Sequence, residues 1–235
     1  MKRAACIAVM MSILYGHQDS NISWKQYARG GGVGSGANSG FSLYYRLKRT
    51  SEFTFRDLRL WGMEMGGNNS FAYLRYKTSR KYHSFEEAYA FSTFAYRQNT
   101  RTGLNLQYHV NQGIGIFLTS YGSGHINAEV GYAADVSDYL NTSEKTSYGK
   151  AGIFWDHDFP FASGSIEVET FMQVGDTKDS DLSRTLIECE FAVPIGKSFR
   201  AIAGAEKEWY HTGSQSGDVS FSLSLGWKGT LNWAL

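Results

Sequence analysis

The sequence predicts an all-β fold: a transmembrane antiparallel up-and-down β-barrel of about 12 strands. Three observations predict it. Hydrophobic residues alternate with a period of two along most of the chain, helical periodicity is almost absent, and the alternating segments are longer than most soluble strands. The 26 glycines and the 15% of aromatic residues suit many strands joined by tight turns, and only 2 prolines interrupt them.

The first residues have the pattern of a secretory signal peptide. Lys2 and Arg3 form a basic start, and the apolar stretch from Ala4 to Tyr15 is too short to cross a bilayer as a helix. We expect residues 1–16 to be a signal peptide and residues 17–235 to form an outer-membrane β-barrel domain. A short interfacial anchor is the alternative for the first segment. A secreted barrel is expected in the outer membrane of a Gram-negative bacterium.

Cysteine content and net charge exclude several classes of protein. Cys6 lies in the expected signal peptide, which leaves Cys189 alone, so neither an internal disulfide nor a thiolate zinc site is expected. The formal net charge of +1 gives no electrostatic footprint for nucleic acid. After residue 16 no segment approaches the length of apolar sequence that a transmembrane helix needs.

The alternation is clearest near the C-terminus. Phe221, Leu223, Leu225 and Trp227 fall on one face of a strand, and serine or glycine occupies the positions between them. The pattern recurs without a linker or a second domain. It predicts strands at 22–34, 38–49, 52–66, 69–80, 85–97, 101–117, 123–138, 143–157, 161–175, 182–194, 198–212 and 217–231.

The expected connections are of two kinds. Those after odd-numbered strands are polar and rich in Gly, Asn and Ser, whereas those after even-numbered strands are tight and contain both prolines, Pro160 and Pro194. Outer-membrane barrels have longer extracellular loops and short periplasmic turns. With an even number of strands, both ends of the chain are therefore expected in the periplasm.

Strand length and aromatic placement favour a membrane barrel over a soluble one. Strands of roughly 12–15 residues exceed the usual soluble length and can cross the hydrocarbon core at a tilt. Aromatic residues near the expected strand ends resemble two interfacial girdles. They are Trp61, Tyr82, Tyr121, Tyr139, Trp155, Phe159, Phe161, Trp209, Tyr210 and Trp233. A soluble barrel of the lipocalin type is the structural alternative.

Residues 85–138 carry a resemblance to a known family. The stretch holds a Tyr/Phe-rich strand ending in FAYRQN, then TGLNLQYHVNQGIGI, then INAEVGY. It resembles the domain of unknown function 481 family, the salt-induced outer-membrane proteins, and the likeness extends more weakly over 22–231. The resemblance implies an outer-membrane barrel and no particular biochemical activity. The chain departs from the family at its end, because members finish on an aromatic assembly signal and this one finishes on Leu235.

No cluster gives a strong signal for catalysis or metal binding. His109, His125, His157 and His211 lie on different expected strands without a compact ligand spacing. The stretch 155–158 has the acid–histidine pairing of omptin proteases, but it adjoins an expected periplasmic turn, which is the wrong end for such a site.

Two further motifs are weak. The stretch 210–214 loosely resembles the His/Ser arrangement of lipid A deacylases, but no carboxylate that would orient the base can be identified. The glycine run at 30–34 is not a phosphate loop, because no helix follows it, and in a strand it indicates close packing or curvature. We therefore expect no catalytic, cofactor-binding or metal-binding residues.

Charged residues in the phase opposite to the lipid-facing one are expected to line the lumen. The bases lie on the second to fourth expected strands and most acids on the ninth to eleventh, so the two sets face each other across a twelve-stranded barrel. The expected lumen-lining residues are Arg46, Lys48, Arg59, Arg75, Lys77, Glu129, Glu167, Glu169, Glu188, Glu190, Glu206 and Glu208. In a water-filled lumen these two charged walls would select solutes by charge. In a narrow lumen the charges would pair with one another and form a polar plug. The third alternative is that the charged side chains are a solvated lining of the lumen without a further role.

Three classes of function remain open. The first is a small-solute or ion pore, or a structural barrel, with a polar charged lumen. The second is an outer-membrane lipid hydrolase or protease. The third is a surface-binding barrel, against which the short loops argue. The expected partners are outer-membrane lipids and lipopolysaccharide, with the barrel-assembly machinery and periplasmic chaperones during biogenesis, and no nucleic acid.

Overall fold

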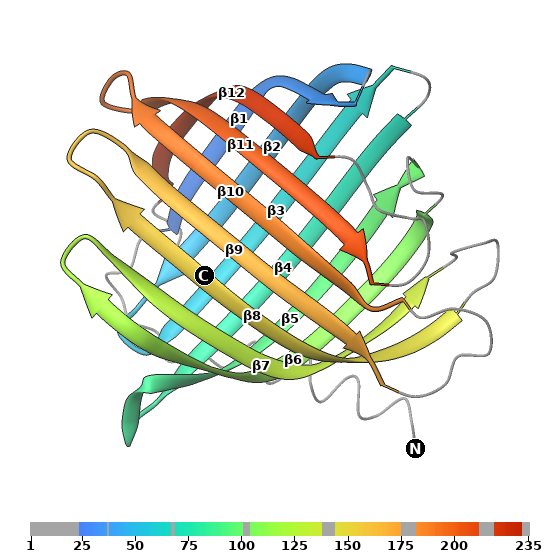
Figure 1. Cartoon of the computed structure of the whole chain (residues 1–235). Helices are drawn as coiled ribbons and strands as arrows, with labels where there is room; N and C mark the ends of the chain where they lie inside the picture. The colour runs from blue at the N-terminus through green and yellow to red at the C-terminus, as the bar shows by residue number, and fades with distance from the viewer. Residues whose placement is uncertain are drawn as a thin grey trace.

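The computed structural model describes residues 24–36, 38–66, 69–100, 104–137, 144–174, 182–211 and 219–231. These residues form one closed antiparallel barrel of strongly tilted strands, closed by pairing of β1 with β12 (Figure 1). The strands are β1 (Trp24–Ser35), β2 (Asn38–Thr50), β3 (Thr54–Met65), β4 (Asn69–Tyr82), β5 (Phe85–Asn99), β6 (Leu104–Tyr121), β7 (Gly124–Ser137), β8 (Glu144–Asp158), β9 (Ser163–Gln173), β10 (Arg184–Pro194), β11 (Phe199–Tyr210) and β12 (Ser220–Leu231). The predicted fold class and the strand number are confirmed.

Each predicted strand corresponds to an observed one, with small differences at the ends. The largest is at β6, which continues to Tyr121 although the sequence pattern predicts an end at 117. The register of β6 against β7 shifts between Phe117 and Thr119, and such a bulge breaks the two-residue alternation on which the prediction depends. The expected signal peptide at 1–16 lies outside the described residues. Among those described, no helix is long and apolar enough to span a membrane.

The two ends of the barrel differ in their connections. At the end where β1 begins and β12 stops, called the terminal end below, short turns at 51–53, 83–84, 122–123, 159–162 and 195–198 join the strands. The turn after β2 is closed by the Thr54 amide, which donates to Ser51 Oγ at 2.9 Å. The opposite end, called the loop end, carries the connections after odd-numbered strands. This division is the one predicted.

The faces of the strands follow the predicted phase. Phe41, Leu43, Val130, Phe221 and Leu223 are all more than half exposed on the outer face. Their neighbours in the opposite phase point inward, and many of these are polar or charged and buried. An apolar exterior around a polar interior is the arrangement of a membrane barrel and the reverse of a soluble one.

Two glycines of the 30–36 stretch have a structural reason to be glycine. Gly36, in the connection after β1, has a φ of 57°, which favours glycine over residues with a side chain. Gly31 lies where β1 and β12 approach closely, and a Cβ there would come within 2.1 Å of the Leu223 carbonyl oxygen. The sequence prediction that this run marks close packing is therefore confirmed at Gly31.

The predicted aromatic girdles need correction at two positions. Trp61 is paired in register with Tyr44 on the inner face, and its ring lies 4.7 Å from that of Phe71. Tyr210 is also buried, opposite Arg184. Tyr210 ends β11 and Trp61 lies inside β3, and the phase of each turns it into the barrel, so the expected position along a strand did not reveal its direction. Tyr139 and Trp233 lie outside the described residues.

Candidate functional site: the charged barrel interior

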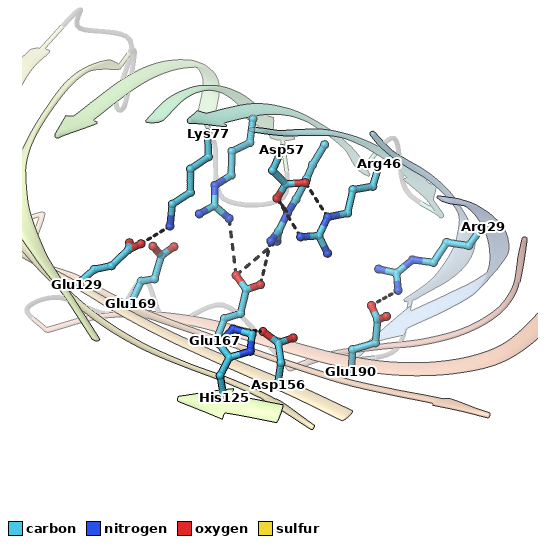
Figure 2. Close-up of polar contacts among 12 residues, drawn as sticks. Arg29, Arg46, Asp57, Lys77, His125, Glu129, Asp156, Glu167, Glu169 and Glu190 are labelled. Atoms are coloured by element: carbon cyan, nitrogen blue, oxygen red, sulfur yellow. Dashed lines mark hydrogen bonds and ion pairs between the residues drawn. The ribbon is translucent and has the colours of Figure 1, made fainter. Parts of the chain in front are cut away.

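The interior is crossed by ion pairs between strands that are not neighbours in the sheet. In Figure 2, basic side chains from β1, β3 and β4 reach across the lumen towards acids on β7, β9 and β10. In a ring of twelve strands, β3 and β9 are diametrically opposite, and so are β5 and β11. Direct contact between them means that side chains fill this part of the lumen.

Glu129 on β7 is almost fully enclosed, with 1% of its surface exposed. It accepts hydrogen bonds from Lys77 Nζ, from Lys150 Nζ at 3.1 Å and from the Tyr89 hydroxyl at 3.0 Å. Lys150 also lies 2.5 Å from Glu169 Oε1. Two ammonium groups and two carboxylates thus balance each other in a space from which water is largely excluded.

The aromatic rings beside these lysines complete the enclosure. Lys77 Nζ lies 5.0 Å from the ring centroid of Phe91 and 4.9 Å from that of Phe154, and Lys150 contacts the same two rings. Ring faces attract cations, which adds to the ion pairs in stabilising buried ammonium groups.

A second group of charges connects β3 to β9. Asp57, 1% exposed, accepts from Arg46 Nε at 2.7 Å and from Arg59 Nε at 2.9 Å. Arg59 then reaches across the barrel and donates from Nη2 to Glu167 Oε1 at 3.0 Å. Arg75 Nη1 lies 3.6 Å from the other oxygen of Glu167. A guanidinium presents several donors in a fixed fork, which lets Arg59 bridge two acids on different strands.

A third group lies towards the loop end. Arg97 donates twice to Glu208, with both distances 2.7 Å, and so joins β5 to β11. Arg184 lies between Glu208, at 3.4 Å, and Asp135, at 3.5 Å. Asp135 also accepts from Gln107 Nε2 at 2.6 Å. Bidentate arginine–carboxylate pairs of this kind are strong and geometrically specific.

Most of the charged residues predicted to line the lumen form ion pairs. Nine of the twelve take part in ion pairs: Arg46, Arg59, Arg75, Lys77, Glu129, Glu167, Glu169, Glu190 and Glu208. Lys48 and Glu188 join none of the ion pairs of the described residues, although both line the internal cavity. Glu206 also faces that cavity, next to Glu188 in the register of β10 and β11.

Six partners in these ion pairs were not among the predicted residues. They are Arg29, Asp57, Arg97, Asp135, Lys150 and Arg184. The signal that could have found them is strand phase: Asp57 shares the inward phase of Arg59, and Arg97 shares that of Tyr89 on β5. The prediction of one basic wall and one acidic wall was therefore too simple, because each wall carries charges of both signs.

An internal cavity of about 590 Å³ remains beside the packed charges. Its wall on β12, β1 and β11 includes small residues such as Ser220, Ser222, Gly226 and Gly204. It reaches the terminal end, where the turn residues Gly122 and Ser123 border it. The lumen is thus divided into an ion-paired part and a polar cavity that β11, β12 and β1 border.

The histidines and the two weak catalytic motifs do not assemble into a site among the described residues. His125 Nε2 lies 3.3 Å from Asp156 at the terminal end, and His157 contacts the Tyr121 hydroxyl at 3.1 Å. His211 Nε2 lies 2.9 Å from Thr185 Oγ1, and residues 212–214 of the second motif fall outside the described residues. Within the described ranges, no group of three or more His, Cys, Asp or Glu residues is arranged to hold a metal ion.

No protein-family model matches the chain, and no curated protein matches it. Solved structures do. The NanC porin has a TM-score of 0.57 at 5% identity, with 86% of this chain and 98% of the porin covered. An outer-membrane channel from Pseudomonas putida F1 has a TM-score of 0.51 at 9% identity, with 92% and 98% covered. The KdgM porin has a TM-score of 0.50 at 8% identity, with 86% and 98% covered. This chain therefore folds as the barrels of outer-membrane porins and channels do.

Proposed function

We propose that this protein is an outer-membrane barrel of a Gram-negative bacterium that passes small solutes or ions along one side of its lumen. The observation that carries the proposal is the cavity of about 590 Å³ beside the ion-paired charges, where small residues of β11 and β12 form part of the wall. Small residues on part of this wall leave room for water and solutes, and charges along a narrow path select among solutes. The porin-like fold supports the proposal.

The setting of the barrel belongs to the same proposal. Outer-membrane lipids and lipopolysaccharide would surround its apolar outer face, and the barrel-assembly machinery and periplasmic chaperones would insert it after removal of the signal peptide at 1–16. Membership of the domain of unknown function 481 family also remains a proposal, supported by the sequence of residues 85–138.

A single-channel measurement on the refolded barrel in a planar bilayer tests the path. Ser222, which lines the cavity, is replaced by Cys and treated with a bulky thiol-reactive sulfonate. We expect steady current steps from the untreated Ser222→Cys variant and a strong reduction of the step size after treatment. Wild type treated with the same reagent is the matched control, because it carries Cys189, which is exposed and also borders the cavity.

The competing reading is a structural barrel, and it has an observation of its own. The pairs Arg59–Glu167 and Arg97–Glu208 each tie opposite strands together, as a plug would. A silent bilayer, with insertion of the barrel verified independently, would favour this reading over the pore. A step size that is unaffected by modification of Ser222→Cys would show that current does not follow the β12 wall.

A further inference from the structure

Four basic side chains line the cavity near the terminal end and lack an acidic partner. Lys25, Lys48, Arg200 and Lys228 form no ion pair with any described residue, in contrast to most charges deeper in the barrel. Their recorded contacts are neutral: Arg200 Nη1 donates to Ser163 Oγ at 3.0 Å, Lys48 Nζ lies 5.3 Å from the Phe55 ring, and Lys228 Nζ lies 5.9 Å from the Tyr27 ring. We name these four residues the basic mouth.

The strand register places the members of the basic mouth near one another. Lys25 on β1 is directly opposite Lys48 on β2, and Lys228 on β12 is opposite Tyr27 on β1. Arg200 on β11 is opposite Gly226, one inward position from Lys228. Like charges directly opposite each other on neighbouring strands repel and destabilise the sheet. This arrangement therefore has a cost in the empty barrel that an anion would remove.

The acids that share the cavity neutralise the basic mouth only in part. Glu190 is paired with Arg29, and Glu167 with Arg59 and Arg75. Asp156 lies beside His125, which is charged only when protonated, and it also interacts with Lys48. Glu188 faces the cavity farther along the strands, opposite Glu167 and Glu206 in register.

At the mouth itself, the charged neighbours of Lys228 are Arg200 and Lys25, with Asp158 as the acid. Positive charge is thus in excess at this end of the cavity, where the four bases face two carboxylates, Asp156 and Asp158.

We propose that the basic mouth is a binding site for a small multivalent anion, such as a phosphate-bearing or polycarboxylate solute. A cavity of about 590 Å³ is within the size range of small-molecule sites. Lysine and arginine bind such oxyanions through charge-assisted hydrogen bonds. Because the four side chains line the internal cavity, the ligand is a free solute and not a lipid headgroup on the outer face. The site rests on the proposed pore only for the membrane setting, since binding does not require conduction.

Equilibrium binding tests the site without reference to current. The barrel is refolded in a phosphate-free sugar detergent and titrated calorimetrically with inorganic phosphate and, separately, with succinate. We expect both to bind wild type and to bind less tightly as salt is added, because mobile ions screen the attraction. Replacing two cations, Lys48→Gln with Lys228→Gln, should weaken binding by at least about tenfold. Asp158→Asn should strengthen it, because it removes one of the two opposing carboxylates.

Lys197→Gln is the matched control. Lys197 is an exposed lysine in the turn between β10 and β11, at the same end of the barrel, and it does not line the cavity. Its loss should leave binding unchanged, and heat-modifiable migration on a gel verifies that each variant is folded. Absence of binding to wild type, or equal binding by wild type and the Lys48/Lys228 double variant, overturns the proposal. If the barrel binds the anions but is silent in bilayers, the anion site stands and the proposed pore is wrong. If it conducts but binds neither anion, the pore stands and the anion site is wrong.

Discussion

At the scale of single residues, each buried charge depends on the oppositely charged side chains around it. Glu129 is the carboxylate shared by Lys77 and Lys150, and it is almost fully enclosed. Removing one member of a buried pair leaves a charge without compensation, which typically costs about 3–5 kcal/mol. We therefore predict that Glu129→Gln lowers the free energy of unfolding by an amount of this order, measured by urea unfolding of the refolded barrel.

The control for this prediction is a glutamate that is more exposed to solvent. Glu190 pairs with Arg29, but its side chain is 39% exposed, and exposed pairs contribute about 0–1 kcal/mol. Glu190→Gln should therefore change the unfolding midpoint much less than Glu129→Gln. Equal effects of the two substitutions would mean that burial does not decide the importance of these charges.

The same residues show what strand phase can and cannot predict. Phase alone predicted that Glu129, Glu167 and Glu208 point inward, and each does. It could not predict their partners, because these depend on barrel diameter and strand stagger, which bring a residue of β3 to the height of one on β9. A plug of paired charges was one of the predicted alternatives, but the sequence did not show which residues would pair.

At the scale of an element, β1 offers a comparison between adjacent glycines. A Cβ at Gly31 would lie 2.5 Å from Ser224 Cα and closer still to a backbone oxygen, whereas one at Gly32 would meet nothing within 4 Å. Backbone cannot move aside as a flexible side chain can, and overpacking typically costs about 1–3 kcal/mol. We predict that Gly31→Ala destabilises the barrel by this amount, by loosening the β1–β12 seam, as measured by urea unfolding.

Gly32→Ala supplies the matched control, with the same substitution one residue along the same strand. It should leave the unfolding midpoint close to that of wild type. If Gly32→Ala were as damaging as Gly31→Ala, the cause would be a general property of the glycine run and not the close approach to β12.

Strand positions were the most predictable feature of the elements. Alternation on β12, where Phe221 and Leu223 face outward and Ser220 and Ser224 are buried, continues without interruption, and the strand was found with the correct phase. On β6 the register shift after Phe117 changes which residues face outward, so the pattern ends before the strand does. Sequence periodicity thus locates regular strands well and fails where a bulge changes the phase.

At the scale of the whole molecule, the proposed pore gives the two parts of the lumen different roles. Cross-barrel pairs such as Arg97–Glu208 fasten opposite walls together, and the cavity along β12 and β1 leaves a route beside them. Glu188 and Glu190 stand on the wall of that route. Fixed negative charges beside a narrow path attract cations and repel anions.

We predict that the double variant Glu188→Gln/Glu190→Gln shifts the permeability ratio of the barrel towards anions, measured from the reversal potential under a salt gradient. Two negative charges are lost from the wall, and Arg29 is released from its pair with Glu190. Glu64→Gln is the control, because Glu64 is an exposed acid on β3 outside the cavity lining, and its loss should leave the ratio unchanged. A double variant that conducts with the wild-type ratio would mean that ions do not pass this wall, and the cavity would then be a binding chamber closed by the cross-barrel pairs.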